Sequence, residues 1–472
     1  MSRASSLSED VRTQQSLLLE QSRAIVAFLL RQGKNVQKIG PDGRLVILAR
    51  ALRTFGYGFT SILLGVMLTH DRLPTAHIGV LLAVAALGSI TFSLVMGMYA
   101  DRMGRKRSLM ISALLMMGTG FTFAFTRYYP LLLIAAFCGT ISPSTNDNTP
   151  FSGIEQSVLA QSSPPERHTT TFAFYNLAAQ FAGALGGLAV GLPEVLSNVG
   201  IPTGSGIRSL FVLYGLLAGS TALLFLRLSP AAELQTQREL FSPASVDEAA
   251  SAGEGTSTQK LNSTQNRRLV LQKPKIRSIV LKLAGLFALD AFAGGLAVQT
   301  MLAVWFRYRF GVSLGSLGLL FFGVNLLAAL SFVVAPRLAR RFGLLKTMIV
   351  PHFVSNIFLL LVPFMPIFPL AAAFLLLRQS LSKLDVPARQ AYTMALVSPE
   401  ERTGAASYTT VARSIAVSAS PAVAGFMLIG PMLVLGLPIL LASCMGVGYD
   451  VTMWRVFRHV PLHPSPMRGK GS

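Results

Sequence analysis

Long apolar stretches recur along almost the whole chain and are separated by polar connections. Each stretch approaches the roughly 20 residues that a helix needs to cross the hydrocarbon core of a membrane. The pattern therefore predicts twelve membrane-spanning helices. We expect them at residues 46–69, 76–99, 108–126, 130–160, 169–192 and 207–227, and then at 278–304, 314–336, 345–364, 367–396, 404–428 and 431–457.

One long polar segment divides this series in its middle. It is rich in Ser, Gln, Glu, Ala and Thr and has almost no apolar periodicity, which is typical of a linker. The predicted fold is therefore an all-α membrane protein with twelve transmembrane helices in two pseudo-symmetric bundles of six. The expected parts are a cytoplasmic tail at 1–44, a bundle at 45–227, a cytoplasmic linker at 228–277, a second bundle at 278–457 and a cytoplasmic tail at 458–472.

Composition supports a membrane protein and excludes a nucleic-acid binder. Hydrophobic residues make up 52% of the chain and charged residues only 13%, whereas about a quarter of the residues in a soluble domain are charged. The net charge of +21 is not gathered in one basic domain, because Lys and Arg lie in alternate connections between the apolar stretches. This asymmetry is typical of cytoplasmic loops and predicts both termini in the cytoplasm. We expect the plasma (inner) membrane.

Two landmarks repeat about half a chain apart. Residues 100–107 read ADRMGRKR and have a weaker echo, ARRFGLLK, at residues 339–346. The triplet at 165–167 is similarly echoed at 400–402. The recurrence indicates duplication of a six-helix unit, with both copies in the same orientation in the membrane.

The first landmark carries a motif that points to a family. It reads Gly97-x-x-x-Asp101-Arg102-x-Gly104-Arg105-Lys106 and lies between the second and third predicted helices. This motif resembles the signature of the major facilitator superfamily, and with the layout of two bundles the resemblance extends over residues 45–457. It implies a transporter whose bundles rock about a central site, with the motif residues acting as a conformational latch on the cytoplasmic side. We expect Glu155 to join this latch as a partner of its basic residues.

Ionisable side chains inside predicted spans are candidates for function, because inserting each costs roughly 2.5–3.5 kcal/mol. Aligning the two halves by their Phe- and Gly-containing segments sets Arg53 opposite Asp290. We predict that these side chains face one another at the central site, where a proton or a charged solute makes and breaks the pair. Two alternatives stay open. Arg50 and Arg53 can instead extend to the cytoplasmic surface, and Asp290 can belong to a structural pair.

Two further spans carry polar interruptions. Asp147 lies between two prolines in the fourth span, where freed backbone groups must face protein or water. It is a candidate for binding a proton or a cationic group, and a hydrogen-bonded kink is the alternative. In the tenth span, four polar residues recur on one helical face, namely Arg378, Ser382, Asp385 and Arg389. This stripe is either a solute path or a structural network, and we favour the network.

The predicted function is secondary active transport of a small organic solute by alternating access, with proton-linked efflux as the first expectation. Uptake or facilitated transport of an organic anion is an alternative, because Arg50, Arg53, Arg378 and Lys383 form a cationic surplus. A transport-fold sensor is another. The sequence contains no phosphate-binding loop of an ATPase and no metal-like histidine spacing, so we expect no enzyme, metal site or cofactor. The expected partners are the solute, the bilayer and protons, and the expected oligomeric state is a monomer.

Overall fold

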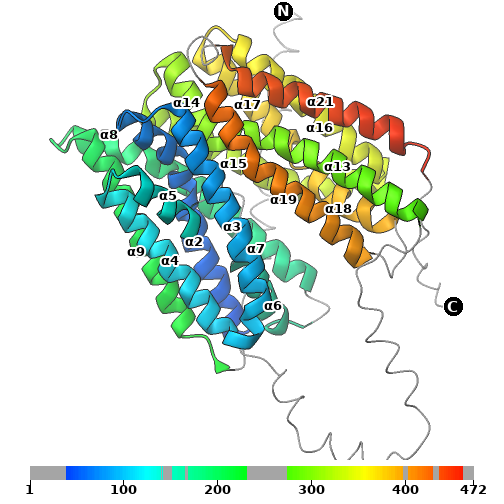
Figure 1. The fold of residues 1–472 in the computed structure, drawn as a ribbon, viewed down its shortest axis with the longest axis horizontal. Helices are drawn as coiled ribbons and strands as arrows, with labels where there is room; N and C mark the ends of the chain where they lie inside the picture. Colours follow the sequence, from blue (N-terminus) through cyan, green and yellow to red (C-terminus); the bar gives the residue numbers. More distant parts are fainter. Residues whose placement is uncertain are drawn as a thin grey trace, which may run out of the picture.

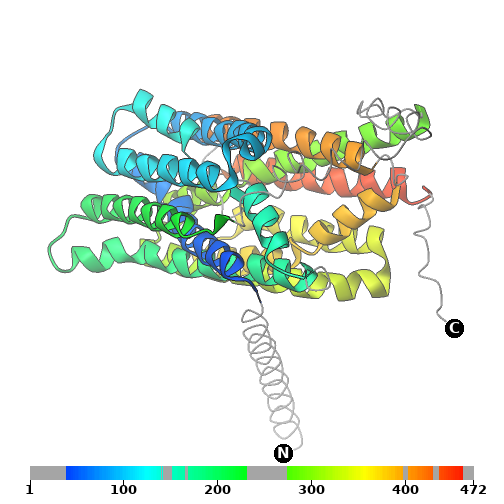
Figure 2. The ribbon, with the colours of Figure 1, turned by 90° about the horizontal axis from the view of Figure 1, so that it is seen from below.

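The computed structural model describes residues 39–139, 141, 151–164, 168–230, 274–396, 402–428 and 435–460. These residues form helices joined by short connections, and no strand occurs among them. The halves of the chain form two helical bundles that lie side by side (Figures 1 and 2). Most of the predicted linker and of both predicted tails lies outside the described residues.

The N-terminal bundle contains five long helices and one interrupted span. Its elements are α2 (Pro41–His70), α3 (Thr75–Met103), α4 (Arg105–Phe125), α5 (Tyr129–Cys138), α6 (Phe151–Gln161), α7 (His168–Leu188), η2 (Ala189–Gly191), α8 (Leu192–Ser197) and α9 (Thr203–Leu226). The fourth predicted span corresponds to α5 and α6. The proline-containing stretch that separates them in sequence lies outside the described residues.

The C-terminal bundle contains two broken spans. Its elements are α13 (Pro274–Leu296), α14 (Gln299–Phe310), α15 (Leu314–Phe342), α16 (Leu344–Leu361), η4 (Val362–Phe364), α17 (Phe368–Leu381), α18 (Asp385–Leu396), α19 (Arg402–Met427) and α21 (Leu437–Phe457). The tenth predicted span divides between α17 and α18. Pro387 accounts for this break, because in a continuous helix its ring would clash with the carbonyl of Lys383, whereas proline is tolerated in a first turn.

Nine segments of the described chain are long and apolar enough to cross a membrane, and one of them joins α13 and α14. Three predicted spans do not meet these criteria by themselves. They are the interrupted pairs α5 with α6 and α17 with α18, and α19, which contains Arg413. The helical architecture confirms the predicted all-α membrane fold and is consistent with twelve spans.

The duplicated landmark has the same backbone conformation in both halves. Gly104 separates α3 from α4 at a φ of 93°, and Gly343 separates α15 from α16 at a φ of 83°. Residues with a side chain rarely adopt a positive φ of this kind, so each junction depends on its glycine. The single-glycine junctions therefore support the duplication that the sequence predicts.

The two bundles are in close contact at one face of the protein. We call it the closed face, and we define it by two contacts, that of Thr75 with Leu428 and that of Glu194 with Leu314. Thr75 of α3 donates a hydrogen bond from Oγ1 to the carbonyl of Leu428, over 2.7 Å. Glu194 of α8 accepts hydrogen bonds from the backbone amides of Leu314 and Gly315, over 2.5 and 3.0 Å. This carboxylate therefore caps the N-terminus of α15, where negative charge is favourable.

Small residues allow the backbones to approach at the closed face. A Cβ atom on Gly79 of α3 would lie only 2.7 Å from the Cα atom of Gly425 of α19. A Cβ atom on Gly191 would lie 3.2 Å from the Cα atom of Gly315. Toward the opposite face, which carries the α3–α4 junction, the two bundles diverge (Figure 1). The contacts of Thr75, Glu194, Gly79 and Gly191 thus join the two bundles at the closed face.

Replacing Gly425 with valine should force the closed face apart. The added side chain would overlap the backbone of α3, and the distance between packed helices depends on the side chains at their contact. Double electron–electron resonance between spin labels at Val199 and Ile367, both exposed near the closed face, should give a mean distance several ångströms longer.

Gly118→Val is the matched control, because Gly118 has no neighbour within 4 Å of an added Cβ atom. Unchanged distance distributions in both variants would contradict the packing described for the closed face.

Candidate functional site

Arg53 and Glu155 form a buried ion pair inside the N-terminal bundle. The two terminal nitrogens of Arg53 on α2 lie 2.7 and 3.0 Å from the carboxylate oxygens of Glu155 on α6. Both side chains are completely buried. Tyr175 of α7 donates a third hydrogen bond to the carboxylate, and the ring of Phe151 lies 4.0 Å from the guanidinium carbon. These contacts satisfy both charges within one bundle.

The predicted contact between Arg53 and Asp290 is therefore wrong, and so is the assignment of Glu155 to the latch. Each of these side chains is bonded within its own bundle. A pair between bundles would be lost whenever the bundles separate, and an unpaired buried charge costs several kcal/mol. Arg50 also lies inside the bundle, with its guanidinium 3.9 Å from the ring centroid of Tyr175, so it does not extend to the surface.

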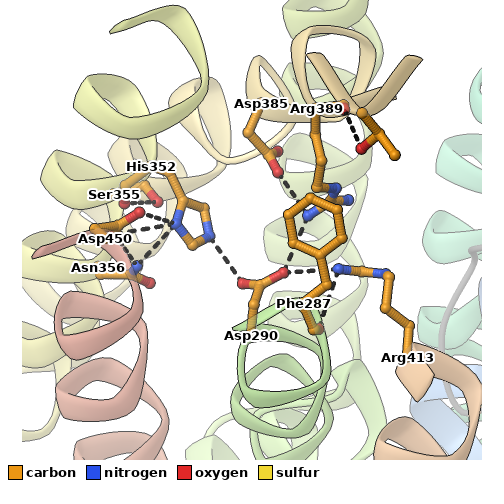
Figure 3. Close-up of polar contacts among 10 residues, drawn as sticks. Phe287, Asp290, His352, Ser355, Asn356, Asp385, Arg389, Arg413 and Asp450 are labelled. Carbon is orange, nitrogen blue, oxygen red and sulfur yellow. Dashed lines mark hydrogen bonds and ion pairs between the residues drawn. The ribbon is translucent and has the colours of Figure 1, made fainter. Parts of the chain in front are cut away.

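The C-terminal bundle contains a larger cluster centred on Asp290 of α13 (Figure 3). Asp290 Oδ2 lies 3.0 Å from Arg389 of α18 and 2.9 Å from Arg413 of α19. Asp290 Oδ1 lies 3.4 Å from Nε2 of His352 on α16. Arg389 also pairs with Asp385 one turn earlier, over 2.9 Å. Four helices are therefore joined through one carboxylate and its partners.

His352 connects Asp290 to a second buried carboxylate. Its Nδ1 atom lies 2.9 Å from Asp450 of α21, and Asp450 is completely buried. Asn356, one turn after His352, donates a hydrogen bond to Asp450 over 3.0 Å. Both ring nitrogens of His352 thus face carboxylate oxygens (Figure 3).

This arrangement requires a proton. An ionised carboxylate only accepts hydrogen bonds, and a neutral imidazole has one donor and one acceptor nitrogen. Two carboxylates can therefore contact the two ring nitrogens favourably only if the ring carries a second proton or one carboxyl group carries it. The Asp290–His352–Asp450 triplet is thus a place where one proton can be held between several groups.

The cluster is not equally buried throughout. Asp450 is completely buried, whereas the side chain of Arg413 is 30% exposed and is the most accessible of the ion-paired groups. Arg413 therefore lies at the edge of the cluster, between the buried carboxylates and the surroundings of α19. Among the described residues, no group of three His, Cys, Asp or Glu side chains is arranged to hold a metal ion.

The structure brings together only part of the predicted site. Asp290 and Asp385 both belong to the cluster, and Arg378 lies near enough to interact electrostatically with Asp290. Asp147 lies outside the described residues. The predicted face of four polar residues is interrupted by the break between α17 and α18, although Asp385 and Arg389 still share one turn.

The predicted latch is described only in part. The side chains of Gly97, Asp101 and Arg102 are outside the described residues. Gly104 makes the junction between α3 and α4, and Lys106 donates a hydrogen bond from Nζ to the carbonyl of Leu228 beyond the end of α9, over 3.2 Å. The latch itself, including the role of Arg105, stays a prediction.

Three central members of the cluster were missed in the sequence. Arg413 and Asp450 are ionisable residues within the predicted spans 404–428 and 431–457, so the rule that identified Asp290 also applied to them. His352 had no metal-like spacing. Its signal was the asparagine four residues later, Asn356, which places two polar side chains on one face of an apolar helix.

The sequence profile described as Major Facilitator Superfamily matches residues 46–421 of this chain. The chain is also 26% identical, over 431 residues, to an uncharacterized membrane protein of Saccharomyces cerevisiae, YJR124C. That similarity covers 87% of this chain and 95% of the yeast protein.

Solved transporter structures share the fold. A bacterial homologue of the human lysosomal transporter Spinster, inward-facing and unoccupied, is similar with a TM-score of 0.66 and 16% identity, over 90% of this chain and 98% of that one. The nucleoside transporter NupG has a TM-score of 0.64 at 12% identity, over 89% and 100% of the two chains. The inward-open xylose transporter XylE from E. coli has a TM-score of 0.59 at 17% identity, over 90% and 97%.

Removing one partner of the N-terminal pair should destabilise the protein strongly. Glu155→Leu leaves the charge of Arg53 buried, which costs roughly 3–5 kcal/mol and should lower the unfolding temperature of the purified protein. The double variant Arg53→Met with Glu155→Leu removes both charges at similar volume and should recover most of the loss. If the single and double variants unfold at the same temperature, the pair is not the source of the effect.

Proposed function

Because this chain belongs to the major facilitator superfamily, we propose that it is a secondary active transporter that moves a small organic solute by alternating access and is coupled to protons. Asp290, His352 and Asp450 form the proposed coupling site. The observation that carries the proposal is the position of His352, whose two ring nitrogens face two buried carboxylates. Such a triplet holds a proton between groups that lie on three different helices.

Charge balance supports this role. The three carboxylates of the cluster, Asp290, Asp385 and Asp450, match the two arginines and a protonated His352. Loss of the proton removes the positive charge that His352 presents to Asp290 and Asp450, and a buried carboxylate that loses a charged partner is costly in surroundings of low dielectric constant unless the helices or a ligand respond. Protonation and conformation are therefore linked in the proposed mechanism.

The connection to the closed face runs through α19. Arg413 of α19 binds Asp290 at one end, and Gly425, three turns later on the same helix, contacts Gly79 of the other bundle. A change in the charge of the cluster alters how firmly α13 holds α19. In the proposed cycle, this change shifts α19 against α3 and releases the closed face.

Outward movement of the solute is the proposed direction. A flux experiment tests both this direction and the coupling to protons. Proteoliposomes containing only the purified protein are given a panel of radiolabelled solutes, including sugars, nucleosides, organic anions and organic cations. A pH gradient is imposed in each direction. The proposal expects at least one solute to accumulate only when the pH gradient is present.

Asp290→Asn and His352→Gln should abolish accumulation driven by the pH gradient, because the proton is no longer held between the three groups. Exchange of labelled for unlabelled solute at equal pH should continue, since it needs no net proton movement. The measurement compares initial rates of both processes.

The matched control is Asp71→Asn, which removes a carboxylate that pairs with Arg208 near the end of α2, away from the cluster. Accumulation that does not depend on pH, or that survives in His352→Gln, would refute proton coupling through this site. Absence of flux for every solute would instead favour a sensor with a transport fold.

A further inference from the structure

Arg378 and Lys383 are two cations beside the cluster, and no carboxylate among the described residues forms an ion pair with either of them. In the described part of the chain, the only hydrogen bond of the Arg378 side chain is to the amide oxygen of Gln379, over 3.2 Å. Its Nε atom is buried without an acceptor. Lys383 makes no hydrogen bond or ion pair with any described residue, and the buried hydroxyl of Ser382 likewise has no partner.

The nearby carboxylates already have basic partners in the cluster. Asp290 contacts His352, Arg389 and Arg413, Asp385 contacts Arg389, and Asp450 contacts His352. Three acidic groups are thus matched by three basic groups when His352 is protonated. Arg378 and Lys383 remain as a surplus of two positive charges among the described ionisable groups around this site.

The surplus lies at the break between α17 and α18. Ser382 follows Arg378 by one turn, and its backbone amide donates a hydrogen bond to the carbonyl of Arg378 over 3.0 Å. Lys383 interacts electrostatically with Asp385 and Arg389, and Arg378 interacts with Asp290. Both cations therefore lie within electrostatic range of the interior cluster.

We propose that the transported solute is an organic anion, and that Arg378, Ser382 and Lys383 bind its carboxylate or phosphate group at the α17–α18 break. This inference rests on the proposed transport function. A guanidinium binds planar or tetrahedral anions through several N–H groups, an ammonium adds a second charge, and a hydroxyl adds a donor. A group with two negative charges would match the surplus of two cations.

The test measures thermal unfolding of the purified full chain in detergent with three probes. Glucose 6-phosphate and succinate carry the proposed anionic groups, and glucose is the neutral match. The anions should raise the unfolding temperature and glucose should not. Arg378→Gln and Lys383→Gln should each increase the anion concentration needed for half of the shift by about tenfold or more, because a charge-assisted hydrogen bond is lost.

Lys282→Gln is the matched control, since Lys282 is an exposed lysine on α13. Each variant must first unfold near the wild-type temperature without a probe. Lys383→Gln serves as the independent second variant if Arg378→Gln fails to fold.

Three outcomes would overturn the inference. One is an equal shift by glucose, and another is a shift by the anions that survives in both variants. The third is that the soluble anions have no effect, whereas phosphatidylglycerol added to phosphatidylcholine raises the unfolding temperature of the wild-type protein but not of the variants. That result would assign the site to a lipid headgroup. If neutral or cationic solutes alone are transported with pH dependence, the anion site fails while the proposed function stands.

Discussion

Pairing of the buried carboxylates with basic residues of the same bundle is the constraint on which the rest of this structure depends. In the first half, Arg53 of the first span pairs with Glu155 of the fourth. In the second half, Asp290 of the seventh span pairs with Arg389 of the tenth. The corresponding spans thus carry pairs of opposite polarity. Because bundles that alternate in access must separate at each face in turn, a charge matched only by the other bundle would be left buried and unpaired.

The two halves differ in what surrounds this pair. In the N-terminal bundle the carboxylate binds one arginine and one tyrosine hydroxyl, and both charges are completely buried. In the C-terminal bundle Asp290 is shared by two arginines and a histidine, and Arg413 remains partly exposed. The first pair is suited to holding helices together permanently. The second contains a histidine between two carboxylates and an accessible edge at Arg413, so it is the half suited to respond to a proton or a solute.

Much of the fold could be predicted from the sequence, because apolar length and the repeated Gly104 and Gly343 landmarks are local features. The partners of individual charges could not be predicted, because helical periodicity places a residue on a face but does not say which neighbouring helix meets that face. For that reason Arg53 was matched with Asp290 by alignment and not with Glu155. The tenth span was predicted as one continuous helix, although Pro387 in its sequence indicates a break.

Proton movement during solute flux tests the central claim most directly. Vesicles containing the purified protein and a pH-sensitive dye are given a gradient of the solute with the highest exchange rate, with no imposed pH gradient. The account predicts a change in internal pH that accompanies the solute and disappears in His352→Gln although the solute still moves. Solute movement without any change in internal pH in the wild-type protein would contradict it.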